Sequence, residues 1–175
     1  KLYPTHIGYE TVEPRYSLVS EGNQNLIFTA ETYNGTFYKE VHLGKNSISV
    51  GYSFERAMRG FLEIELNLSM PSCDGPAGRY WFRGQCPGGF GQMQKFTDLT
   101  ELALEDDVLS GSLVLQSSRP LTLTARPFFT VSQSKKKKKK IMQAVSLVIH
   151  YPFSADADSL QISLEIFARD MSFAI

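Results

Sequence analysis

Apolar and polar residues alternate along most of the chain, and this period of two is typical of strands with one buried and one wet face. The clearest case is the segment 60–68, in which apolar positions alternate with polar ones: Leu62, Ile64, Leu66 and Leu68 against Glu63, Glu65 and Asn67. Similar alternation occurs over 47–54, 121–126 and 160–168. The pattern therefore predicts a chain built largely from strands.

Turn residues separate these segments at short intervals. Asn34-Gly35 lies between the β-rich runs 26–33 and 36–43, and this dipeptide is a strong signal for a type I′ hairpin turn. Only 97–107 has helical spacing, so we expect at most one short helix there. About nine or ten strands without repeated βα units predict an all-β fold, an antiparallel β-sandwich or a jelly roll.

The length of 175 residues and the hydrophobic content of 42% predict one domain over 1–175, with an irregular lead-in at 1–14. Basic and acidic residues balance at 18 each, but six of the basic ones form the run Lys135 to Lys140. Removing this run leaves 12 basic against 18 acidic residues, so the body is acidic. The chain starts at Lys1 without a signal peptide, which we interpret as a domain excised from a longer protein.

Two cysteines flank a glycine- and proline-rich segment, 73–86. A disulfide between Cys73 and Cys86 would close a 14-residue loop and stabilise the domain by about 3 kcal/mol. The alternative is two free thiols. No zinc-ligand spacing is present, and we predict no metal and no cofactor.

Two N-glycosylation sequons begin at Asn34 and Asn67. We expect Asn34 at a hairpin tip and Asn67 on the polar parity of its strand, so both would face water. With the predicted disulfide, these positions favour a secreted protein or the extracellular or luminal part of a membrane protein.

The lysine run has three interpretations. It could bind anionic lipid headgroups or sulfated glycans, with Lys135, Lys136, Lys137, Lys138, Lys139 and Lys140 as the anionic-ligand residues. It could be a solvated hairpin loop at 134–140, or a run that is engineered or stands in for unassigned residues. Nucleic acid is not expected as a partner, because no aromatic residues interleave with the lysines.

Aromatic residues gather in and after the cysteine loop. The set Tyr80, Trp81, Phe82, Arg83 and Phe90 contains the residue types that favour interface hot spots, and we predict it as a protein-partner surface. The same residues could instead form a plug over one end of the core.

Signals for catalysis are few. His6, His42 and His150 are scattered along the sequence, and no nucleophile elbow or phosphate-binding glycine motif occurs. Acidic pairs at 106–107 and at 156 and 158 are too few to predict a calcium site. We predict no catalytic residues.

These observations favour a non-enzymatic extracellular or luminal interaction module that binds a protein partner, in an unknown oligomeric state. The first alternative is a peripheral lipid-binding domain that uses the lysine run, and the second is a viral or assembly-forming jelly roll. An enzyme acting on glycans through paired carboxylates is the least favoured class.

Overall fold

The computed structural model describes residues 2–4, 13–32, 35–55, 60–72, 75–134, 137–153 and 159–168. These residues form twelve strands, and all their pairings are antiparallel. The strands are β1 (Leu2–Pro4), β2 (Ser17–Glu21), β3 (Asn25–Thr32), β4 (Gly35–Leu43), β5 (Ser47–Phe54), β6 (Gly60–Leu68), β7 (Gly78–Phe82), β8 (Gln85–Gly89), β9 (Gln94–Asp106), β10 (Gly111–Ser134), β11 (Lys137–Phe153) and β12 (Ser159–Ala168). The predicted all-β antiparallel fold is confirmed.

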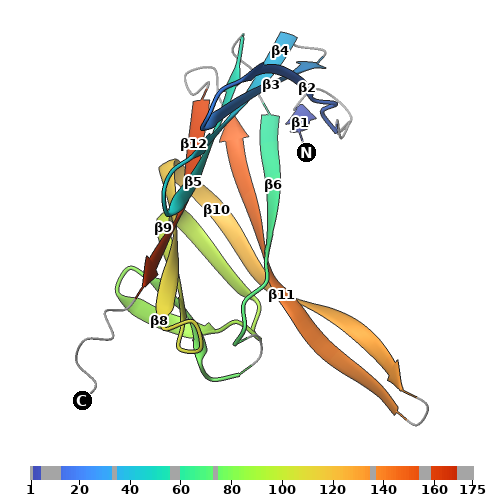
Figure 1. The fold of residues 1–175 in the computed structure, drawn as a ribbon, viewed down its shortest axis with the longest axis vertical. Helices are drawn as coiled ribbons and strands as arrows, with labels where there is room; N and C mark the ends of the chain where they lie inside the picture. The colour runs from blue at the N-terminus through green and yellow to red at the C-terminus, as the bar shows by residue number, and fades with distance from the viewer. Residues whose placement is uncertain are drawn as a thin grey trace.

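One strand connects the two halves of the sheet. The first half of β10, Gly111 to Ser117, pairs with β12, and its second half, from Thr122 onward, pairs with β11. The full order is β1-β6-β11-β10-β12-β5-β4-β3-β2, while β9 pairs with the other edge of β10 and carries β7 and β8. Because β10 changes partner midway, the sheet folds over into two layers, seen in Figure 1 as the strands around β5 and those around β6.

The core lies between these layers. Phe54 of β5 meets Phe153 of β11 edge to face, with ring centroids 4.7 Å apart. Phe37 of β4 packs against Phe54 with centroids 4.5 Å apart and is fully buried. The alternation that places these rings inward places the intervening residues of β4, β5 and β12 on the outer face of their layer.

A second cluster fills the space under β7 and β9. Tyr80 and Phe90 are fully buried and meet edge to face, with centroids 5.1 Å apart, and Tyr80 also contacts Phe96. Gly78 permits this packing, because a Cβ there would lie 2.3 Å from Cδ2 of Phe90. The two clusters belong to one continuous core.

A buried carboxylate fixes the turn between β9 and β10. Asp106 accepts hydrogen bonds from both the amide and the hydroxyl of Ser72, and from the amides of Val108 and Leu109. Burial disfavours the charged form, but these hydrogen bonds outweigh it and hold the pKa of Asp106 below its ordinary value.

The predicted helix at 97–107 is wrong, because this segment belongs to β9. Phe96, Leu99 and Leu102 are all buried, and their spacing of three imitates one face of a helix. The strand accommodates this spacing at two shifts of its register to β10. One lies between Phe96 and Leu99, where Asp98 has a φ of 50°, and the other lies between Leu99 and Glu101. A bulge therefore returns Phe96 to the core side.

Two further segments differ from the prediction. The lysine run is not only a loop, because Lys137 to Lys140 pair with Val131 to Ser134 and extend β10 and β11 into a two-stranded arm that projects from the body (Figure 1). The segment 73–86 contains β7 and the start of β8, which form a hairpin around Arg83 and Gly84.

The predicted hairpin between β3 and β4 is confirmed, although Asn34 itself lies outside the described residues. Within the described chain, no helix could span a membrane.

Candidate functional site

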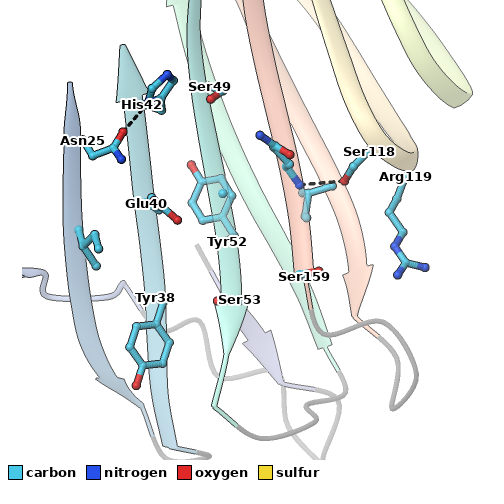
Figure 2. Close-up of a pocket in the computed structure, with 14 residues that line it drawn as sticks. Asn25, Tyr38, Glu40, His42, Ser49, Tyr52, Ser53, Ser118, Arg119 and Ser159 are labelled. Carbon is cyan, nitrogen blue, oxygen red and sulfur yellow. Dashed lines mark hydrogen bonds between the residues drawn. The ribbon is translucent and has the colours of Figure 1, made fainter. Parts of the chain in front are cut away.

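An open groove of about 960 Å³ lies on the outer face of the layer formed by β3, β4, β5 and β12. In Figure 2, residues of β4 line one side, Ser118 and Arg119 of β10 stand on the opposite side, and serines lie between them. The outward-facing residues of the strands, together with the two β10 residues, are Asn25, Ile27, Tyr38, Glu40, His42, Ser49, Gly51, Ser53, Ser118, Arg119, Ser159 and Gln161.

Strand alternation positions the first wall. On β4, Phe37 is buried in the core, so Tyr38, Glu40 and His42 project from the opposite face. These three side chains span four residues of strand, or about 13 Å. Tyr38 remains 37% exposed, so part of its ring is accessible from the groove.

Small residues form the floor. Ser49, Gly51 and Ser53 occupy the outward positions of β5, next to Ser159 and Gln161 of β12 in the paired register. A Cβ at Gly51 would meet only the Cβ of Glu40, at 3.9 Å, so packing does not demand glycine there. The missing side chain instead leaves the middle of the floor open.

The second side of the groove depends on an irregularity in β10. Its register to β9 shifts between Gln116 and Leu121, and Pro120, which has no amide hydrogen to donate to a neighbouring strand, lies in this stretch. The hydroxyl of Ser117 donates a 2.7 Å hydrogen bond to the carbonyl of Arg119, and Ser118 Oγ accepts a 2.9 Å bond from the amide of Gln161. The irregularity thus ties β10 to β12 and brings Arg119 to the rim.

His42 makes a hydrogen bond to the neighbouring strand at one end of the groove. Its Nδ1 contacts Oδ1 of Asn25. An amide oxygen can only accept, so Nδ1 of His42 is the donor in this contact. Glu40, on the same face of β4, adds carboxylate oxygens. The groove therefore offers donors and acceptors of several kinds around an exposed aromatic ring.

The chemistry suits a neutral, hydroxyl-rich ligand. Glu40 and Arg119 are the only carboxylate and guanidinium among the described lining residues, so their charges balance. Amides, hydroxyls and an imidazole can each bind hydroxyl groups, and a tyrosine ring offers an apolar surface with a polar tip. The same part of the lining lacks a second carboxylate, which most glycoside hydrolysis uses.

The predicted partner surface is split by the fold. Tyr80 and Phe90 are fully buried and Phe82 is half-buried against Phe96, as in the alternative of a core plug. Trp81 and Arg83 remain exposed. No finding tests whether these exposed residues bind a partner.

The remaining predicted residues lie elsewhere. Cys86 is a free, exposed thiol, so the predicted disulfide to Cys73 is not formed, although Cys73 itself lies outside the described residues. Asn67 is exposed on β6 as expected. Lys140 is exposed on the arm with its Nζ 4.0 Å from the centroid of the Phe129 ring, while Lys135 and Lys136 lie outside the described residues. Cys86, Asn67 and Lys140, which the structure describes, do not line the groove.

Sequence reasoning missed the groove, although one signal was present. The outward positions of β5 at 49, 51 and 53 and of β12 at 159, 161 and 163 carry serine, glycine and glutamine, where solvated strands usually carry lysine, glutamate or threonine. Small outward side chains on two paired strands leave room for a ligand. The contribution of Arg119 had no comparable local signal.

Comparison with known proteins identifies the class. The model of the family described as alpha-amylase/4-alpha-glucanotransferase, C-terminal, matches residues 10–166. Because this match spans most of the chain, the protein belongs to that family. No curated protein sequence matches it.

Solved structures agree on the fold. The 4-alpha-glucanotransferase of Thermococcus litoralis superposes with a TM-score of 0.60 at 14% identity over 95% of this chain and 26% of that one. The heparan sulfate lyase HepC of Pedobacter heparinus gives a TM-score of 0.52 at 13% identity over 89% of this chain and 22% of that one. The Slr1438 protein of Synechocystis gives 0.54 at 10% identity over 87% and 66%. The chain thus spans about a quarter of the first two proteins.

The family match corrects the functional predictions. The family is described as a C-terminal domain of alpha-amylase and 4-alpha-glucanotransferase, so the prediction of a non-enzymatic ectodomain that binds a protein partner is wrong, and so are the lipid-binding and viral alternatives. Without a disulfide, the description as an extracellular glycoprotein loses its main support. A secreted or luminal location stays a prediction that no finding tests.

Proposed function

We propose that this chain is the C-terminal β-domain of an enzyme acting on α-1,4-glucans, and that its groove binds the glucan chain. The observation that carries this proposal is the groove itself, in which Tyr38, Glu40 and His42 face a floor of serines and Gly51. The family gives the class of ligand, because its name refers to amylase and 4-alpha-glucanotransferase.

The groove matches a glucan in shape and polarity. A pyranose ring has an apolar C–H face that suits the ring of Tyr38, and hydroxyl edges that suit Glu40 and Gln161. The distance from β4 to β10 is three strand spacings, or about 14 Å, which leaves room for a short oligosaccharide.

Charge favours a neutral glucan over a sulfated one. Glu40 offsets Arg119 within the groove, and the lysine-bearing arm projects away from the strands that form it (Figure 1). A polyanion would therefore meet no net positive field in the groove.

The test is calorimetric titration of the 175-residue chain with maltotriose. We expect Tyr38→Ala and Glu40→Gln each to weaken binding by roughly tenfold, because each removes a contact worth about 1–1.5 kcal/mol. The matched controls are Phe61→Ala, an aromatic with 41% exposure on the opposite layer, and Glu21→Gln on β2.

Both controls should bind maltotriose as the unaltered chain does, and cellotriose should bind no variant. Equal affinity of the groove variants and the controls would overturn the proposal.

A further inference from the structure

The outer face that contains the groove continues beyond it. In the paired register, Ser163 of β12 lies beside Gln116 of β10, which lies beside Glu101 of β9. Gln116 donates a 3.1 Å hydrogen bond from Nε2 to Glu101. The polar row that begins at Asn25 and His42 therefore extends without a break across six strands.

The next row ends on the single tryptophan of the chain. Glu165 of β12 pairs with Val114, Val114 with Ala103, and Ala103 with Trp81 on β7. Trp81 lies on the opposite side of β7 from the buried Tyr80 and is 39% exposed. Its indole is therefore on the same face as the groove.

Polar contacts fix the orientation of this ring. The indole Nε1 of Trp81 donates to Oε2 of Glu105, which lies two residues along β9 from Ala103, the cross-strand neighbour of Trp81. Arg79 holds the same carboxylate at 3.3 Å and binds both oxygens of Asp107 at 2.9 Å. Because Ala103 is small, the ring leans over β9, and these bonds hold it in place without a ligand.

We propose that Trp81 is a second stacking platform for the same α-1,4-glucan chain, reached only by longer oligosaccharides; this inference rests on the proposed function of the groove. Trp81 and Tyr38 are five strand spacings apart across the sheet and about six residues apart along it, which amounts to a surface path of roughly 30 Å.

The residues along this path suit a sugar chain. Between the two rings lie serines, Gln116, Glu101, Val114 and Ala103, which leave a low surface with hydrogen-bonding groups at intervals. The indole of Trp81 is already held in one orientation before a ligand binds. It therefore loses little conformational entropy on binding, and its apolar area contributes more fully to affinity. Short oligosaccharides would thus contact Tyr38 in the groove alone, and longer ones would reach from Tyr38 to Trp81.

The test uses Trp81 as its own reporter, because the chain contains one tryptophan. Fluorescence and calorimetric titrations are made with maltotriose and maltoheptaose. We expect maltoheptaose to bind more tightly and change the fluorescence, and maltotriose to bind without changing it. Trp81→Ala should weaken maltoheptaose binding roughly tenfold and maltotriose binding less than twofold.

The outcomes separate the two proposals. If both sugars bind with Tyr38-dependent affinity while Trp81 fluorescence and Trp81→Ala binding stay unchanged, the second platform is overturned and the groove stands. If Trp81 responds but Tyr38→Ala and Glu40→Gln bind normally, the groove is overturned and with it the shared path. Absence of binding by any maltooligosaccharide overturns both. The fluorescence result does not depend on any variant folding.

Discussion

The buried carboxylate of Asp106 should contribute a large share of the stability of the domain. It accepts four hydrogen bonds, and it joins Ser72, which follows β6, to the turn that connects β9 and β10. In Asp106→Ala, the amide and hydroxyl of the buried Ser72 lose their acceptor, at roughly 1–1.5 kcal/mol each. Water can replace part of the acceptor for the amides of Val108 and Leu109, so we expect a total loss of about 3 kcal/mol.

The assay is urea unfolding at pH 7, with Asp107→Ala as the matched control. Asp107 is an adjacent but exposed carboxylate that pairs with Arg79, so its loss should cost about 1 kcal/mol or less. A loss below about 1 kcal/mol for Asp106→Ala, or equal losses for both variants, would refute the reasoning.

The pH dependence of stability checks the same interaction independently. Because hydrogen bonds hold the folded pKa of Asp106 below its ordinary value, its contribution is complete above about pH 4 to 5 and is lost as the pH falls through the folded pKa. Asp106→Asn keeps an acceptor for the turn amides but cannot titrate. We therefore expect the stability of this variant to fall less steeply below pH 5 than that of the unaltered chain, and parallel curves would contradict this.

Three further predictions concern single positions. Gly51→Ala should keep or raise the free energy of unfolding, since its Cβ meets nothing closer than 3.9 Å. It should weaken maltotriose binding by about fivefold, because the added methyl group occupies space in the floor of the groove. Unchanged affinity would contradict the placement of the ligand. Gly78→Ala should destabilise the domain by about 1–3 kcal/mol, measured by urea unfolding, because its Cβ would lie 2.3 Å from the ring of Phe90; a stable variant would show that the ring can move. Cys86 should react with a thiol reagent in the native protein without reductant, as seen by peptide mapping. Reaction only after reduction would show that Cys86 is held in a disulfide.

The strands could be predicted from the sequence wherever every second residue of a segment was apolar. Leu62 is buried and Leu66 packs against the core, while Glu65 and Asn67 face solvent, as the alternation indicated. The prediction failed at β9, because the bulge at Asp98 converts a strand pattern into a spacing of three. Local sequence does not show which residue of a strand has a positive φ.

The arm and the groove could not be predicted in the same way. The lysine run gives no apolar period, so the pairing of Lys140 with Val131 depends on the register set by the preceding strand. The groove needs β4, β5 and β12 side by side, and β12 is far from the other two in the sequence. Arg119 reaches the rim only because β10 changes partner at the irregularity before Leu121.

The central claim is that an α-1,4-glucan binds the outer face of β4, β5 and β12. Titrating ¹⁵N-labelled protein with maltotriose and following the amide resonances tests it most directly, because the spectrum locates the ligand without any substitution. We predict that the largest shifts fall on the outward-facing residues of 38–42, 49–53 and 159–161, with little change on β6. Shifts concentrated on β6 and the arm, or no shifts at saturating maltotriose, would contradict the account.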